Sequence, residues 1–410
     1  MEMKISEIIF REDLYPRFEA DQAKIREYSE NLEVLPPVII NQDKILIDGY
    51  HRMQAHRQAG KEVIEVIVEE TKSENELYLR AIETNSTHGL QLSLKDKQRT
   101  ALKLYDGTNT ERLQKALSVS ERTIRSWTLN KRKEIEEERN ERIIAEYLKA
   151  ELTQQQVADK FGVGVATVNE LIKKFENGKV ADSENIKDFK PFLYNIWNVN
   201  KESNKTNHFG LFPEVFMENL IYYYTKPFDI VYDPFAGGGT TIDVCKKWFR
   251  RYYVSDRKPI PARDKEIKKW DIADGLPKDF KPKTKFIFLD PPYWTQAKSK
   301  YSEDPEDLAN MELVEFEDKM KQLFKELSKK CDTGTYMAFV ISASQWKVDE
   351  HQRVDHALDF VKMAEMFGWK VHERIICPYS TEQYSGTHVN IVKEEKIMLN
   401  LYRDLVVMKK

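Results

Sequence analysis

The 410-residue sequence has few cysteines and no long apolar run, and each shortage excludes a class of protein. Its three cysteines, Cys245, Cys331 and Cys377, stand far apart in or beside apolar segments. We therefore expect buried thiols, with neither a disulfide framework nor a zinc site. No run reaches the length of about 18 apolar residues that spans a membrane, and residues 1–10 do not resemble a signal peptide. The sequence predicts a cytoplasmic protein without membrane contacts.

Histidine pairs at metal-ligand spacing are also missing. His51 and His56 are five positions apart, as are His351 and His356, so neither pair shares a helical face. We expect no metal site.

The net charge of −3 does not by itself indicate a nucleic-acid partner, but its distribution is uneven. Residues 1–90 carry 11 Lys/Arg against 18 Asp/Glu, whereas residues 91–180 carry 18 against 14. A basic middle third suits contact with phosphates, although ordinary solvated helices share such a balance.

A chain of this length is expected to form two or three domains. Composition turns polar at residues 177–188, the best candidate for a linker, and the pattern changes there from helical to alternating strands and helices. We predict domains at residues 1–90, 91–180 and 181–410.

The first domain combines strands at residues 4–10, 38–40 and 44–47 with a helix at 21–31, the last two strands forming a hairpin. A second helix opens at Gly49, where free backbone N–H groups, His51 and Arg52 gather and can hold a phosphate. Residues 5–70 resemble the ParB/sulfiredoxin-like family, which implies a small α+β fold with a nucleotide or phosphate at Gly49, His51 and Arg52. A docking or dimerisation module without turnover, and hence a homodimer, remains an open alternative.

The middle domain is expected to be all-α, with two helix-turn-helix segments at residues 112–127 and 153–175. The second helix of such a module enters the major groove of DNA. The candidates for contact with DNA are Arg122 and Arg125 in the first segment, and Thr167, Asn169 and Lys173 in the second. Pairs of helices that pack without binding DNA are the alternative.

The C-terminal domain alternates apolar strands with amphipathic helices, which predicts a Rossmann-like, doubly wound α/β sheet. Its strands are expected at residues 229–232, 251–255, 285–289, 335–341, 372–376 and 396–402, the last forming a hairpin with 405–408.

Two polar stretches follow predicted buried strands and lie at the sheet edge where α/β proteins bind ligands. The first contains three glycines, Gly237 to Gly239, in a strand-to-helix turn that permits close approach of a ligand. No Lys-Ser/Thr follows it, so the turn is not a P-loop. Asp256, which ends the next strand, is placed to bind ribose hydroxyls.

The second stretch is Asp290-Pro291-Pro292-Tyr293. A carboxylate at Asp290 and a carbonyl at Pro291 can each accept one hydrogen of an exocyclic amine and direct its lone pair at a methyl group. Tyr293 offers a ring face for a base that has left the helix.

These motifs resemble those of the S-adenosylmethionine-dependent amino-methyltransferases of DNA, over residues 190–410. The resemblance implies a donor site that also includes a segment before the first strand and a contact with the donor's adenine. Its residues are His208, Phe209, Asp233, Pro234, Phe235, Ala236, Gly237, Gly239, Thr240, Asp256, Asp271 and Ile272. It further implies DNA contacts after the catalytic motif, where Lys298 and Lys300 are the candidates.

The sequence as a whole predicts a DNA methyltransferase that acts on double-stranded DNA at the N6 amino group of adenine. Adenine is preferred because a leading Asp is commoner in the adenine enzymes of this family. Methylation of cytosine N4 is the alternative within the class. A DNA-binding regulatory or partition protein with a nucleotide at its N-terminal domain is the alternative from another class. The setting, as a modification enzyme alone or with a restriction partner, stays open.

Overall fold

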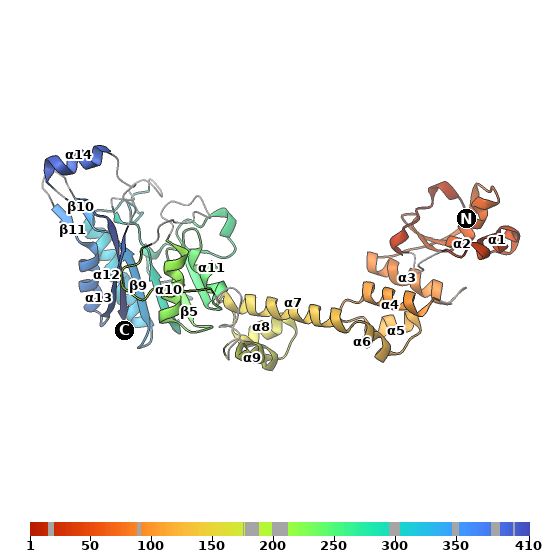
Figure 1. Ribbon diagram of the computed structural model, residues 1–410, viewed down its shortest axis with the longest axis horizontal. Helices are drawn as coiled ribbons and strands as arrows, with labels where there is room; N and C mark the ends of the chain where they lie inside the picture. The colour runs from red at the N-terminus through yellow and green to blue at the C-terminus, as the bar shows by residue number, and fades with distance from the viewer. Residues whose placement is uncertain are drawn as a thin grey trace. The chain divides into compact units, whose positions relative to one another are not determined.

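The computed structural model describes residues 1–14, 20–87, 92–174, 176, 188–198, 212–294, 304–346, 352–378, 386–396 and 398–410. The chain divides into two compact units, Met1–Asn140 (unit 1) and Glu141–Lys410 (unit 2), whose elements are drawn in Figure 1. The boundary falls inside helix α7 (Leu129–Leu148). The domain boundaries expected at residues 90 and 180 stay predictions. Of the two predicted helix-turn-helix segments, the one at residues 112–127 lies in unit 1 and the one at residues 153–175 in unit 2.

Unit 1 begins with a four-stranded mixed sheet in the order β1-β4-β2-β3. The hairpin expected at residues 38–47 is confirmed, because β2 and β3 pair antiparallel. A strand over residues 4–10 is wrong: β1 ends at Lys4 and a 3₁₀ turn follows, since Ile5 and Ile8 both enter the core at a helical rather than a strand spacing. The strands are β1 (Glu2–Lys4), β2 (Val38–Asn41), β3 (Leu46–Asp48) and β4 (Val63–Glu69).

The helices of unit 1 form two groups that meet at α3. Leu77 and Ala81 of α3 pack with the sheet residue Ile47, whereas Leu79 and Ile82 pack with the helices that follow. The helix expected at residues 21–31 is present, with the Asp21 side chain accepting a hydrogen bond from Lys24 N. The helices are α1 (Gln22–Ser29), α2 (Tyr50–Gln58), α3 (Glu74–Thr87), α4 (Leu94–Leu104), α5 (Thr110–Leu117) and α6 (Glu121–Trp127).

Unit 2 contains a seven-stranded mixed sheet in the order β12-β13-β9-β8-β5-β6-β7. The five strands from β9 to β7 run parallel, and β13 is antiparallel to both of its neighbours. This is the α/β sheet that the sequence predicts, with one antiparallel strand inserted. The strands are β5 (Ile230–Asp233), β6 (Arg251–Asp256), β7 (Lys268–Lys269), β8 (Thr284–Leu289), β9 (Tyr336–Ile341), β12 (Lys370–Pro378) and β13 (Tyr402–Lys409).

Helices cover both faces of this sheet, as Figure 1 shows. One face packs on Phe216 and Met217 of α10 and on Ile242 of α11, and the other packs on Phe324 of α12 and Phe360 of α13. Strands that are covered on both faces carry apolar residues in succession, which explains the runs visible in the sequence. The remaining elements are α10 (Glu214–Tyr224), α11 (Thr240–Lys247), α12 (Leu313–Lys330), α13 (His356–Glu365), α14 (Gly386–Glu395) and a hairpin of β10 (Ser344–Trp346) and β11 (Gln352–Val354).

The hairpin expected at the end of the chain is wrong. Residues 398–401 form no strand, and residues 402–409 form the single strand β13, which inserts between β9 and β12. Leu405 to Met408 are at most 1% exposed, so both faces of β13 are buried and it occupies an interior position. Burial on both faces, not a local turn, decides its pairing.

Helices α8 (Gln154–Phe161) and α9 (Val165–Lys174) belong to unit 2, and buried residues of both belong to the core cluster on one face of its sheet. Arg251, the first residue of β6, donates hydrogen bonds to Tyr147 O (3.1 Å) and Leu152 O (3.2 Å). The Tyr147 ring also lies 5.9 Å from that of Phe228, just before β5. The end of α7 and the loop before α8 are therefore fixed at the amino ends of β5 and β6, opposite the strand ends that carry Asp233 and Asp290.

Candidate active site

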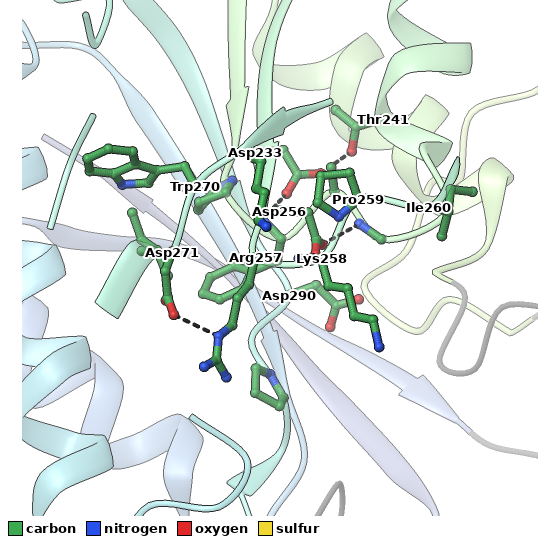
Figure 2. Close-up of a pocket in the computed structure, with 18 of the residues that line it drawn as sticks. Asp233, Thr241, Asp256, Arg257, Lys258, Pro259, Ile260, Trp270, Asp271 and Asp290 are labelled. Atoms are coloured by element: carbon green, nitrogen blue, oxygen red, sulfur yellow. Dashed lines mark hydrogen bonds and ion pairs between the residues drawn. The ribbon is translucent and has the colours of Figure 1, made fainter. Parts of the chain in front are cut away.

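A cavity of about 1030 Å³ opens at the carboxyl ends of the parallel strands β5, β6 and β8. Figure 2 shows the side chains that converge on it from these strand ends and the loops after them. Both predicted motifs contribute, because Asp233, Gly237 and Asp290 line the same space. The lining also contains most of the predicted donor residues, namely Pro234, Phe235, Ala236, Thr240, Asp256, Asp271 and Ile272.

Asp233 holds the glycine turn in shape. It ends β5, is 2% exposed, and accepts hydrogen bonds from Phe235 N (2.8 Å) and the Thr241 hydroxyl (2.5 Å). Burial raises the pKa of Asp233 to about 7. Gly239 has φ +88° at the start of α11, a conformation that favours glycine, and it does not belong to the cavity lining. Asp233, at the cavity, and Gly239, outside its lining, thus both shape the donor turn.

Asp256 fixes the opposite side of the turn. Its carboxylate accepts hydrogen bonds from Gly237 N (2.9 Å) and Lys258 N (2.8 Å), which ties the end of β6 to the glycine turn after β5. A carboxylate has about four acceptor sites, so these two bonds leave capacity for hydroxyl groups of a ligand.

Asp290 directly follows the last residue of β8 and is partly buried at the cavity. Burial raises the pKa of this carboxyl to about 7, and the Arg403 guanidinium and a hydrogen bond from Tyr293 oppose the rise. Arg403 is 6% exposed and reaches the site from β13. The position of this cation could not be anticipated from the motif, because β13 joins the sheet more than a hundred residues later.

Trp294 anchors the catalytic turn and carries no predicted role. It is 2% exposed, has φ +42°, and its indole N–H donates a hydrogen bond to Met311 O (2.9 Å). Its backbone N–H also bonds Pro292 O (2.7 Å), which closes the turn that Asp290 begins. Its position beside the motif was the only sequence signal.

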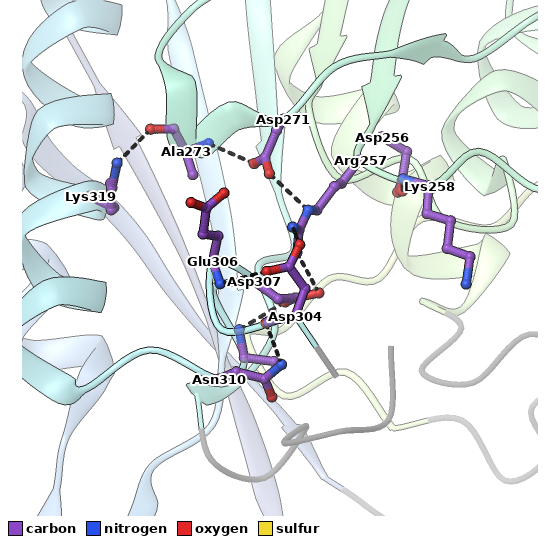
Figure 3. Close-up of polar contacts among 11 residues, drawn as sticks. Asp256, Arg257, Lys258, Asp271, Ala273, Asp304, Glu306, Asp307, Asn310 and Lys319 are labelled. Carbon is purple, nitrogen blue, oxygen red and sulfur yellow. Dashed lines mark hydrogen bonds and ion pairs between the residues drawn. The ribbon is translucent and has the colours of Figure 1, made fainter. Parts of the chain in front are cut away.

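Asp271 lies in the cavity but is engaged by Arg257, a residue that the sequence did not single out. The Arg257 Nε is 2.8 Å from Asp271 Oδ2, and Asp271 Oδ1 accepts from Ala273 N (Figure 3). Ile272 is 7% exposed and packs in the core cluster as well as lining the cavity.

Several predicted residues fall outside the described residues: His208, Phe209, Lys298 and Lys300. The neighbouring Phe212 is described, lines the cavity, and lies 4.7 Å from Phe288 of β8, ring to ring. Phe212 itself therefore reaches the cavity, while the role expected of His208 and Phe209 stays a prediction.

The two groups of predicted DNA contacts lie in different units. Arg122 and Arg125 are exposed on α6 of unit 1, and Arg125 pairs with Glu121 (2.5 Å). Thr167, Asn169 and Lys173 lie on α9 of unit 2. These contacts with DNA stay predictions.

At the predicted phosphate site, Gly49 has φ +103° and begins α2, as the sequence requires. A side chain at Gly49 would meet Val38 at 2.6 Å. The Arg52 guanidinium is already bonded to Asp48 (2.7 Å) and to the carbonyls of Pro36 and Pro37, and His51 Nε2 accepts from Asp21 N. The nucleotide site therefore stays a prediction. To bind a phosphate, Arg52 would have to give up its hydrogen bonds with Asp48 and the two proline carbonyls.

No group of three or more His, Cys, Asp or Glu in the described part of the chain is placed to hold a metal ion. No described helix is long and apolar enough to cross a membrane.

The seven-stranded mixed sheet, with its cavity at the ends of the parallel strands, defines an α/β domain of the methyltransferase type. Residues 40–259 match the model of a family described as DNA methylase. This is more than half of the chain, and the chain belongs to that family. The match includes the glycine turn and ends before Asp290.

Comparisons with individual proteins cover shorter stretches. The transcriptional regulator NovG of Streptomyces niveus is 35% identical over 83 residues, 20% of this chain and 26% of that protein. The type II methyltransferase M.Cfr9I of Citrobacter freundii is 39% identical over 64 residues, 16% of this chain and 21% of that protein. The chain thus spans about a quarter and a fifth of these relatives.

A solved structure similar to this chain is the truncated partitioning protein ParB of Caulobacter crescentus complexed to the parS site. It has 15% identity and a TM-score of 0.26, and the alignment covers 42% of this chain and 99% of that one.

S-adenosylmethionine is the methyl donor of the DNA methylase family, and the cavity fits its charge. Six carboxylates line the cavity against three basic side chains, which suits a ligand with a cationic sulfonium. The carboxylates are Asp233, Asp256, Asp271, Asp290, Asp304 and Asp307, and the basic residues are Arg257, Lys258 and Lys269.

Proposed function

We propose that the chain is a DNA amino-methyltransferase that methylates adenine at N6. The observation that carries this proposal is the meeting of the glycine turn and Asp290 in one cavity. The bound donor supplies an electrophilic methyl group. Asp256 and Gly237 would hold the donor's nucleoside part, and Asp233 would keep the turn in place through its hydrogen bonds with Phe235 and Thr241.

Asp290 is the residue that activates the target. Its carboxylate and the carbonyl of Pro291 each accept one hydrogen of the exocyclic amine, which draws the nitrogen towards tetrahedral geometry. Pro291 and Pro292 stiffen the turn and remove N–H groups that would compete for the carboxylate. Tyr293 is held beside Asp290 by its hydrogen bond, where its ring can stack on an extruded base. Transfer is a direct displacement, with no covalent enzyme intermediate.

Adenine is proposed as the base because the motif begins with Asp. Cytosine N4 carries the same kind of amine and is the alternative that the assay must separate. No side chain that would distinguish the two bases is identified among the described lining residues, so the choice rests on the motif.

Unit 1 is proposed to supply most of the DNA contact. Residues 93–133 carry 11 Lys/Arg against 4 Asp/Glu, whereas residues 141–174 around α8 and α9 carry five of each. Lys149 and Lys160 of the second group both pair with Glu146, at 3.0 and 2.5 Å. Electrostatic attraction to phosphates therefore favours the first helical pair. A regulatory protein that only binds DNA is the rival function.

The test is incubation of the full chain with labelled S-adenosylmethionine and mixed-sequence double-stranded DNA, followed by nucleoside mass spectrometry. We expect N6-methyl-2′-deoxyadenosine from the wild type. Asp290→Ala should abolish the product while donor binding, measured by calorimetry, changes by less than about five-fold, because Asp290 acts on the target amine. The control Asp318→Ala, on an exposed position of α12, should keep full activity. Near-normal turnover by Asp290→Ala would refute the catalytic role of Asp290. Detection of N4-methylcytosine in place of methylated adenine would show that cytosine is the target base.

A further inference from the structure

Arg257 lies at the centre of an ion-pair cluster between the donor cavity and the segment that leads away from the catalytic motif. Its Nε is 2.8 Å from Asp271, its Nη2 is 2.5 Å from Asp304, and its Nη1 is 3.0 Å from Asp307. Figure 3 shows these carboxylates gathered around one guanidinium. Each of the three nitrogens lies nearest a different carboxylate, Nη1 at ion-pair distance without a hydrogen bond, and a lysine ammonium could not reproduce this arrangement.

The segment that Arg257 holds is compact. Asp304 O accepts from the Asn310 side chain (2.7 Å), and Asp307 Oδ1 accepts from Ala309 N (3.0 Å). Leu308, between them, lines the donor cavity and is 6% exposed. Residues 304–311 therefore form one wall of the cavity, and the guanidinium ties that wall to the end of β6.

The same segment supports the catalytic turn. Met311 O accepts the indole N–H of Trp294 at 2.9 Å, and Trp294, Leu308 and Met311 belong to one buried cluster. Trp294 directly follows Tyr293 in the chain. A continuous set of contacts thus runs from Arg257 through residues 304–311 to the turn that carries Asp290.

The charge balance makes this link depend on Arg257. Asp307 is 7% exposed and Asp271 is mostly buried, so solvent screens their mutual repulsion poorly. Without the guanidinium, Asp271 and Asp307 would lose their shared cation at a cavity that already carries an excess of acidic groups, while solvent would screen the more exposed Asp304. Repulsion would then favour movement of residues 304–311 away from β6.

We propose that Arg257 is a positioning residue of the transfer reaction. By holding residues 304–311 against the donor cavity, it keeps Trp294, and with it the Asp290 turn, in register with the donor. This inference rests on the proposed methyltransferase function.

The test compares full-length Arg257→Met, Arg257→Lys and Asp304→Asn with the control Arg374→Met, which removes a cation paired with Asp404 on the strands β12 and β13. At saturating donor and DNA, we expect kcat to fall at least ten-fold in Arg257→Met and two- to five-fold in Asp304→Asn. Arg257→Lys should recover only part of the loss. The dissociation constant of the donor, measured by calorimetry, should weaken less than kcat falls. A kcat that returns to normal at saturating donor would overturn the proposal, because Arg257 would then act only in donor binding.

A second measurement does not depend on turnover. Hydrogen–deuterium exchange of the full chain should speed up in both residues 290–294 and 304–311 in Arg257→Met, and in neither segment in Arg374→Met. Faster exchange confined to residues 304–311 would overturn the coupling. If the wild type methylates no nucleoside, the proposed function fails, yet the exchange result still decides whether Arg257 positions the catalytic turn.

Discussion

Replacing Asp290 with asparagine should abolish methylation and at the same time stabilise unit 2 at alkaline pH. The wild-type carboxyl has its pKa raised to about 7 by burial, against a usual value of 3.8. A raised pKa means that the fold accommodates the protonated carboxyl better than the charged one. The carboxyl therefore opposes folding increasingly as the pH rises from about 4 through 7. An asparagine stays neutral and avoids this cost.

The expected magnitude follows from the shift. About three pKa units, at about 1.36 kcal/mol each, correspond to about 4 kcal/mol at pH 8. At pH 5 most of the wild-type carboxyl is protonated in the folded state, so the stability gained by the asparagine variant is expected to be only about 1.5 kcal/mol. The charge of Asp290 also contributes to the raised pKa of the nearby Asp233. Removing that charge should lower the pKa of Asp233 and so add to the stability gained at alkaline pH. For a unit of this size the gain at pH 8 corresponds to a rise in Tm of about 10 °C.

Scanning calorimetry of the full chain at pH 5 and pH 8 measures this gain. Added S-adenosylmethionine identifies the transition of unit 2, because a ligand raises only the transition of the unit that binds it. Asp318→Asn, at an exposed position, is the control and should leave that transition unchanged. A Tm gain that is equal at both pH values, or absent at pH 8, would refute the reasoning that Asp290 is held in an environment unfavourable to its charge.

Two further predictions concern DNA and the donor turn. The double variant Arg122→Ala/Arg125→Ala should weaken DNA binding about ten-fold and should reduce the slope of log affinity against log salt concentration by about one to two. The single variant Glu121→Ala frees Arg125 from its 2.5 Å ion pair and should strengthen binding. Fluorescence anisotropy at several salt concentrations measures both effects. Gly239→Ala should lower the stability of unit 2 by about 1 kcal/mol and weaken donor binding. The reason is that Gly239 has φ +88° and that a Cβ there would lie 3.3 Å from the Arg263 side chain. Unchanged donor affinity, measured by calorimetry, would contradict a role for this turn.

The sequence was informative where local chemistry and burial agree. Buried strands with apolar residues on both faces predicted β5 and β8, and the polar residues that end them, Asp233 and Asp290, meet in one cavity as expected. Parallel strands bring their carboxyl ends to one edge, so strand order alone was sufficient for this placement.

Local patterns failed where pairing depends on distant parts of the chain. The strand β13 was expected as half of a hairpin, yet it inserts between β9 and β12, since only there are both of its faces covered. That position has no signal in the residues of β13 themselves.

By itself, the sequence determined the reaction chemistry expected of this protein, because the glycine turn and the Asp290 motif are short segments whose chemistry needs only their own residues and a strand before each. The tertiary structure decided what surrounds them. Arg403 comes from β13, Asp304 and Asp307 converge on Arg257, and Trp294 finds its partner at Met311. Charges and hydrogen bonds act over a few ångströms in space, and folding brings together residues that no spacing along the chain identifies as neighbours.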